Sequence, residues 1–222
     1  MEREKLLNAQ KISLELFSAI EARRLIGPGK TEGQLNAEIC DLAIREFGIR
    51  EHWHKRIVRS GRNTLATYPD NPPDREIERD DILFIDLGPV VQGYEADIGR
   101  TYVLGNDRSK TRLKHDVEEA WHQIRDWYQR HTSLKASMLY RYAVGKAMEF
   151  GWEFHGAIAG HIVGKYPHEQ PADPASLQLD IHPDNDYDIF LPDANGNKRH
   201  WILEVQFVDK DLGIGAYFEQ LL

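Results

Sequence analysis

Two acidic residues close strand-like segments in the middle of the chain. The apolar run in DILFIDLG (81–88) ends on Asp86, and Asp97 lies eleven positions later in GYEADIGRTYVLG (93–105). A buried carboxylate is costly unless a cation or a hydrogen-bond donor faces it. The spacing fits two antiparallel strands joined by a short turn, which would bring both carboxylates to one face. The chemistry open to this pair depends on what faces it.

Three more residues could join this pair. His161 lies in a Gly-His segment, Glu204 interrupts the apolar run WILEVQF, and Glu219 follows GAYF. Clustered carboxylates raise one another's pKa values, whereas two divalent cations would neutralise them. One imidazole with four carboxylates suits Mn, Fe, Co or Zn, and two such ions ~3.5–4 Å apart can make a shared water nucleophilic at neutral pH. Taken singly, each of the five residues is more often structural, as a turn former, a cap or a solvent-facing acid.

Helices and strands must alternate along the chain to position these residues. Helical spacing of apolar residues and a capping box at Thr31 and Gln34 predict four helices, and the chain ends in two strands around DKDLG. The endings AIREFG and AMEFG of two helices echo each other, which favours two α-plus-strand halves. ANGN (194–197) reads as a hairpin turn. The predicted helices cover residues 2–25, 31–48, 109–131 and 136–151, and the predicted central strands cover 81–88 and 93–105.

The composition is that of a globular protein with one domain. The chain has 222 residues, of which 41% are hydrophobic and 29% charged, and a net charge of −8. This charge argues against a nucleic-acid partner, and no apolar run approaches the ~20 residues that span a bilayer. The N-terminus lacks the pattern of a secretory signal, and the single cysteine, Cys40, permits no disulfide within the chain. We therefore expect a cytoplasmic protein that binds neither nucleic acid nor membrane.

Two longer motifs resemble those of one enzyme family. IDLGPVVQGYEADIGRTYVLG (85–105) and AGHIVGKYPHEQP (159–171) resemble successive blocks of the M24 metallopeptidases, which include methionine aminopeptidase, Xaa-Pro aminopeptidase and prolidase. ILEVQF and GIGAYFEQLL resemble the family's two glutamate strands. The resemblance implies an α+β pita-bread fold, with two pseudo-symmetric α/β halves around a curved antiparallel sheet. It also implies one catalytic domain over residues 1–222, without the extra N-terminal domain of prolidase-type relatives.

The same resemblance assigns two divalent metal ions (Mn, Co, Fe or Zn) and a role to each matching position. Asp86 would chelate one ion, and His161 and Glu204 would hold the other. Asp97 and Glu219 would bridge the two. His168 resembles the histidine that contacts the substrate or the developing oxyanion, and Glu204 resembles the proton shuttle, so these two residues are the expected catalytic pair.

The sequence departs from the family where the substrate would bind. The family has a histidine upstream of its first Asp, and here TYPDNPPD puts Tyr68 near that place as an expected substrate-binding residue. HIVG replaces the family's His-Gly-x-Gly, and LEVQF lacks the family's Glu-Pro-Gly. All five metal positions are spared, so we expect the metals to remain while the substrate has changed. The acidic segment 172–200 reads as a solvated loop, or as a cover that selects small or basic substrates.

These features favour a dimetal hydrolase of the aminopeptidase kind, which cleaves the N-terminal residue of a peptide or a small amide with a metal-bridging hydroxide. One alternative is a divergent enzyme on the same scaffold with iron-dependent oxidative chemistry. Another is a non-catalytic binding protein that kept the fold. The expected partner is a peptide or small amide, and the sequence is compatible with a homodimer.

Overall fold

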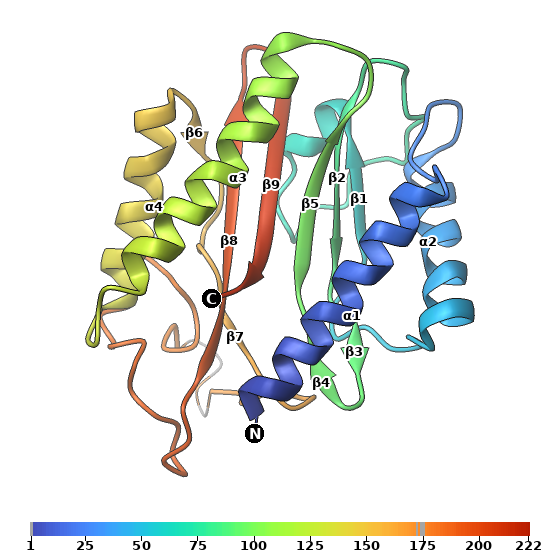
Figure 1. Ribbon diagram of the computed structural model, residues 1–222. Coiled ribbons are helices and arrows are strands. Elements are labelled where there is room, and N and C mark those ends of the chain that lie inside the picture. The colour runs from blue at the N-terminus through green and yellow to red at the C-terminus, as the bar shows by residue number, and fades with distance from the viewer. Residues whose placement is uncertain (1, 172, 174–175) are drawn as a thin grey trace.

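The computed structural model describes residues 2–171, 173 and 176–222, and its elements occur in two similar series (Figure 1). Each series has two helices followed by the strands of one half of a sheet. The first series comprises α1 (Glu2–Ala22), α2 (Glu32–Phe47), β1 (Ile57–Ser60), a 3-10 turn (Gly61–Leu65), β2 (Ile82–Leu87), β3 (Val90–Val91), β4 (Tyr94–Glu95) and β5 (Ile98–Val103). The second comprises α3 (Arg108–Tyr128), α4 (Ala136–Phe150), β6 (Glu153–Phe154), β7 (Ile162–Val163), β8 (His200–Asp209) and β9 (Ile214–Leu221).

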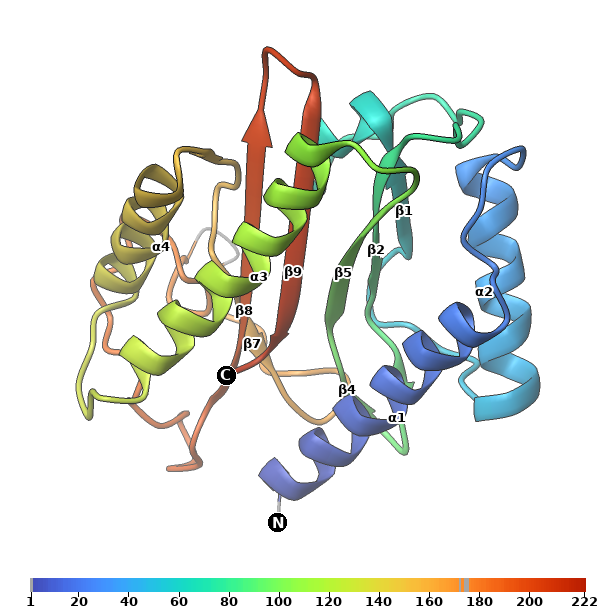
Figure 2. The same cartoon turned by 45° about the horizontal axis from the view of Figure 1, so that its top comes forward.

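The main sheet joins the two series at its centre. Its order is β1-β2-β5-β9-β8-β6, with β7 also paired to β8, and every pairing is antiparallel. In Figures 1 and 2, α1 and α3 cross in front of the strands and α2 and α4 lie at the two flanks. The central pair, β5 and β9, therefore marks the boundary between the halves.

Local capping sequences determine where the helices begin and end. Thr31 accepts a hydrogen bond from Gln34 N, and the Gln34 side chain accepts one from Thr31 N, so the predicted capping box begins α2. Gly48 and Gly151 end α2 and α4 in the left-handed conformation, with φ of 66° and 81°. The echo of AIREFG and AMEFG thus marks equivalent points of the two halves. The first helix ends at Ala22, three residues earlier than expected.

Each half has its own apolar core on the helix side of the sheet. In β2, Leu83, Ile85 and Leu87 pack into the first core, while Phe84 packs on the opposite face with Ile57 and Tyr217. All six residues of β2 are buried, as its nearly continuous apolar run predicts. The alternation turns Asp86 away from the helices. The site therefore lies on the face of the sheet that the helices leave uncovered.

Two expectations for residues 172–200 are wrong. ANGN makes a turn, in which Asp193 accepts hydrogen bonds from the backbone of Asn195 and Asn197, but no paired strands flank it and β8 begins only at His200. The segment is also not a solvated loop throughout, because Leu179, Ile181 and Ile189 are buried in the second core. Residues 172, 174 and 175 lie outside the described part of the chain. Among the described helices, none is long and apolar enough to cross a membrane.

Candidate metal centre

One row of residues across four strands brings three carboxylates to a common face. Asp86 on β2 lies opposite Gly99 on β5, Gly99 lies opposite Glu219 on β9, and Glu219 lies opposite Glu204 on β8. Directly opposed residues in a sheet project to the same side. Gly99 supplies no side chain, and a Cβ there would lie 2.4 Å from the Tyr217 ring. The row therefore holds three acids around a glycine gap.

His161 and Asp97 lie next to this row of acids. His161 Nε2 lies 3.3 Å from Asp97 Oδ2 and 4.0 Å from Glu219 Oε1. Its Nδ1 lies 2.9 Å from the Ile162 carbonyl oxygen. A carbonyl only accepts, so Nδ1 carries the hydrogen and Nε2 is the nitrogen that faces the acids. The structure thus brings together four of the five predicted ligands with the fifth, Glu204, beside them.

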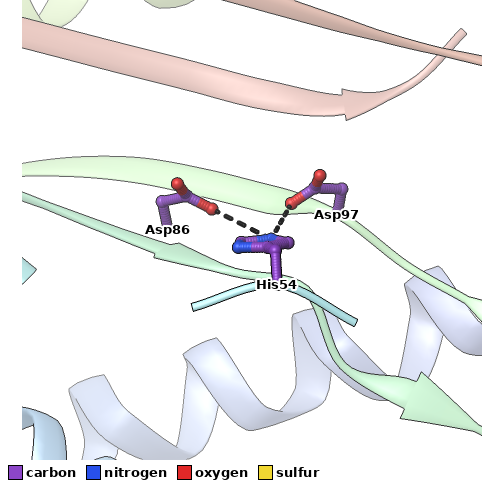
Figure 3. A group of neighbouring side chains, drawn as sticks. All are labelled: His54, Asp86 and Asp97. Atoms are coloured by element: carbon purple, nitrogen blue, oxygen red, sulfur yellow. Dashed lines mark hydrogen bonds and ion pairs between the residues drawn. The ribbon is translucent and has the colours of Figure 1, made fainter. Parts of the chain in front are cut away.

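A second histidine, His54, lies among the same acids, and the sequence analysis missed it. Its Nε2 lies 3.0 Å from Asp97 Oδ1 and 3.6 Å from Asp86 Oδ1, as Figure 3 shows. Its Nδ1 lies 2.7 Å from the Lys55 carbonyl oxygen. The sequence feature that could have pointed to it is HWH (52–54), just before β1. Because Ile57 pairs with Asp86, the residues before β1 lie close to the end of β2, near Asp86.

Gly88 makes room for this histidine. Trp53 N donates to the Gly88 carbonyl at 2.9 Å, and a Cβ on Gly88 would lie 2.1 Å from the His54 ring. The glycine of the DLG motif is therefore required by a close approach. The Trp53 ring lies edge-on to the rings of His54, His161 and His168, at centroid distances of 4.5, 5.1 and 5.3 Å.

Burial and mutual repulsion set the charges of the cluster. Burial raises the pKa of Asp86 to about 7, although His54 opposes the shift. Burial would also raise the pKa of Asp97, but the positive charge of His54 and the hydrogen bond from His161 outweigh it and lower that pKa to about 2. Burial, Asp97 and Asp86 hold the pKa of Glu219 well above its usual range. Asp86 and Glu219 therefore hold their protons more tightly than free carboxyls do.

The imidazoles carry the compensating charge in the absence of another cation. Burial would lower their pKa values, but Asp97 and Asp86 raise the pKa of His54 to about 10, and Asp97 raises that of His161 to about 9. Each ring then faces a carboxylate as an imidazolium. A metal ion takes the place of such a proton when it binds.

The residues present fit divalent cations. Asp86 Oδ1 and Glu219 Oε2 are buried and accept no hydrogen bond from the described residues, so each has a lone pair left for a cation. Two groups of donors have ligand atoms within 4.8 Å of one another among the described residues: His54, Asp86 and Asp97, and Asp97, His161 and Glu219. Both groups contain Asp97. This geometry could hold two cations with Asp97 common to both.

Glu204 is held differently from the other acids. The Tyr217 hydroxyl donates to Glu204 Oε2 at 2.6 Å, and Glu204 belongs to neither compact donor group. Burial raises its pKa, and His161 opposes the shift. One oxygen is therefore committed to Tyr217 while the other is left for a cation or a proton.

A cavity of about 490 Å³ opens over the metal centre, and its walls include the remaining predicted residues. His168 is one of them, and its Nδ1 lies 2.8 Å from Glu95 Oε2. Glu95 is buried and also accepts from the backbone N–H groups of Gly164 and His168, so it fixes the ring. Tyr68 is 53% exposed, with its ring centroid 6.0 Å from that of His54. The acidic segment contributes Asp180 to the wall.

Comparison with known proteins identifies the family. A model of metallopeptidase family M24 matches residues 4–191, and the chain belongs to this family. The Xaa-Pro dipeptidase of Pyrococcus horikoshii is 29% identical over 158 residues, which are 70% of this chain and 43% of that protein. The Xaa-Pro dipeptidase of Pyrococcus furiosus matches with the same identity and coverage. The chain spans less than half the length of these curated relatives.

Solved structures confirm the pita-bread fold. A prolidase from Thermococcus sibiricus superposes with a TM-score of 0.76 at 23% identity, over 98% of this chain and 55% of that one. An X-Pro aminopeptidase from Thermotoga maritima gives 0.77 at 24% identity, over 98% and 56%. A methionine aminopeptidase from Rickettsia prowazekii gives 0.69 at 15% identity, over 98% and 90%. At these identities the likeness concerns the fold.

Proposed function

We propose that the chain is a dimetal-dependent hydrolase that removes the N-terminal residue of a peptide or cleaves a small amide. The observation that carries the proposal is the cross-strand row of Asp86, Glu219 and Glu204, joined by Asp97 and His161 beneath a cavity of about 490 Å³. The two buried carboxylate oxygens without hydrogen-bond partners support it. So do the names of the relatives, Xaa-Pro dipeptidase and X-Pro aminopeptidase.

In this proposal the five ligands divide between two ions. Asp86 would hold one ion, His161 and Glu204 would hold the other, and Asp97 and Glu219 would be ligands of both. When bound, two divalent ions would acidify a water between them and polarise the scissile carbonyl.

Two side chains of the cavity then move or hold protons. Glu204 receives the proton of the attacking water, because its pKa is raised by burial and Tyr217 holds one of its oxygens in place. His168 gives its Nδ1 hydrogen to Glu95, which leaves Nε2 for the substrate. This position matches the family's histidine that contacts the substrate or the developing oxyanion. Tyr68, which also lines the cavity and is 53% exposed, is the second substrate-binding residue of the proposal.

The test is a comparison of metal-stripped and reloaded protein on a panel of peptides. The protein is stripped with chelator, reloaded with Mn²⁺, Co²⁺, Fe²⁺ or Zn²⁺, and assayed on Xaa-Pro dipeptides, longer peptides and N-terminally blocked controls. We expect cleavage of free-amine substrates by reloaded protein alone, and a loss of about 10²-fold or more in Glu204→Gln. A reloaded protein that cleaves none of these substrates overturns the proposal.

One observation favours a second candidate, iron-dependent oxidative chemistry. With His54 beside Asp86 and Asp97, the cluster has two imidazoles and four carboxylates. Di-iron carboxylate proteins use the same number of each donor. Oxygen consumption by the iron-loaded protein, absent with zinc, would favour this reading over hydrolysis. The cytoplasmic location and a homodimer stay predictions from the sequence.

A further inference from the structure

His54 and His161 have matching arrangements on either side of Asp97. In each ring, Nδ1 donates to the carbonyl of the next residue, Lys55 at 2.7 Å and Ile162 at 2.9 Å. In each ring, Nε2 faces one oxygen of Asp97: Oδ1 at 3.0 Å for His54 and Oδ2 at 3.3 Å for His161. A ligand histidine has its other nitrogen fixed by an acceptor in this way. By this criterion the two rings are equally prepared to bind a metal.

Asp86 supplies the second argument. Its Oδ1 is buried and has no hydrogen-bond partner in the described part of the chain, and the His54 nitrogen is 3.6 Å from it, which is too long for a hydrogen bond. If His54 only donated a hydrogen bond to Asp97, Asp86 Oδ1 would stay buried without a partner. Donors that share one ion at bond lengths of ~2.0–2.2 Å stand roughly 3–3.6 Å apart. The two measured separations, 3.0 and 3.6 Å, fall in this range.

The third argument is that His54 is buried together with Asp86 and Asp97. The His54 side chain is 5% exposed, and those of Asp86 and Asp97 are 8% and 3% exposed. Gly88 lacks the Cβ that would displace the ring, so the backbone is shaped around it. Tyr68, which lies in the sequence near the place of the family's upstream histidine, is 53% exposed, with its ring centroid 6.0 Å from that of His54.

We infer that His54 is a metal ligand, which binds through Nε2 the same cation as Asp86 and gives each of the two cations one imidazole. This inference rests on the proposed function, since it requires the dimetal site. The resulting donors are two imidazoles and four carboxylates: His54 and Asp86 on one side, His161 and Glu204 on the other, and Asp97 and Glu219 between them. The fitting ligands are first-row divalent ions that accept mixed nitrogen and oxygen donors, with iron matching a known use of this set.

The test reads metal coordination directly and does not depend on hydrolysis. Protein selectively labelled with ¹⁵N-histidine is loaded with Co²⁺, and paramagnetically shifted, exchangeable imidazole N–H signals are recorded. Both rings keep a hydrogen on Nδ1, so we expect two such signals in the unmodified protein. One signal alone would overturn the inference, because His54 would then only orient Asp97. A protein with two signals but no peptidase activity would reject hydrolysis while keeping His54 as a ligand.

Two variants sharpen the result. His54→Ala should lose one shifted signal and bind the second Co²⁺ equivalent at least 10-fold more weakly, and added imidazole should restore both. His155→Ala is the matched control, because His155 lines the same cavity but its Nε2 is bound to the Leu65 carbonyl, away from the acids. We expect it to keep two signals and wild-type affinity. A His54→Ala protein with unchanged Co²⁺ affinity and two shifted signals contradicts the inference.

Discussion

The two sides of the proposed metal centre differ in the elements that carry their donor residues. On the second-half side, Glu219 and Glu204 lie opposite each other on β9 and β8, which pair over eight residues, and His161 directly precedes β7. On the first-half side only Asp86 lies within a strand, and His54 lies in a loop ahead of β1. Donors on paired strands have positions fixed by register, whereas a donor on a loop depends on tertiary contacts such as those of Trp53 and Gly88. The comparison teaches that a pseudo-symmetric fold can complete a site with a residue outside its motifs.

The largest effect is expected at the residue that both sides share. Asp97→Ala removes the only carboxylate common to both compact donor groups and leaves His54 and His161 without their partner. Metal content should fall from about two ions per chain to below one, as measured by elemental analysis. Asp180→Ala is the control, because Asp180 lines the cavity but belongs to neither group. Retention of both ions by Asp97→Ala would mean that the two sides do not meet there.

The next effect separates the rim residues of the two sides. His168 is fixed by Glu95 and touches the substrate in the proposed mechanism, whereas Tyr68 is 53% exposed. His168→Ala should lower kcat/KM for a cleaved peptide by about 10²-fold at unchanged metal content. Tyr68→Phe should change it by less than about 10-fold, because removing an exposed hydroxyl is a small perturbation. The reverse order of effects would move substrate activation to the first-half side.

A pH effect tests the repulsion among the acids of both sides. A carboxyl whose pKa is raised on folding adds to the stability of the folded state. The whole of this stability is present below the unfolded pKa, and it is lost as the pH rises through the folded pKa. Glu219, whose pKa is raised by burial and by Asp97, behaves this way. In chelator, Glu219→Gln should therefore gain free energy of unfolding over the unmodified protein as the pH rises from 5 to 8.

Denaturant unfolding at the two pH values measures this gain. Glu15→Gln is a suitable control, since the Glu15 side chain is 55% exposed on the surface of α1. With saturating metal the advantage of Glu219→Gln should disappear, because the bound cations then stabilise the carboxylate. A constant difference between variant and unmodified protein across the pH range would contradict the electrostatic account.

The smallest effect is expected at the pairing of β5 with β9, where the two halves of the sheet meet. In Gly99→Ala the new Cβ would lie 2.4 Å from the Tyr217 ring and 3.0 Å from Glu219 Cβ, so it should destabilise the protein by about 1–3 kcal/mol. Gly145→Ala in α4 has open space around the Cβ and should be neutral or stabilising. Thermal unfolding of both variants measures the contrast. Equal Tm values would show that the close packing at Gly99 is not required.

The sequence predicts the donors that lie in a strand or directly before one, and it misses the donor in a loop. Asp86 and Glu219 lie in strands that apolar runs mark, and Asp97 directly precedes β5, so the spacing of the strands brings the three together. His54 has no periodic pattern around it, and only the packing of its loop against Gly88 brings it to Asp97. The ANGN turn illustrates the opposite error, since turn residues alone do not create a hairpin without strand-forming neighbours. The repeated helix endings were informative because αL capping by glycine is local chemistry.

The most direct test is a crystal structure of the protein grown with Mn²⁺, with anomalous scattering used to locate the ions. The account predicts two anomalous peaks, one on either side of Asp97, with His54 beside the peak near Asp86 and His161 beside the other. No peak within reach of Asp97, or a single peak with His54 still hydrogen-bonded to that carboxylate, would contradict it.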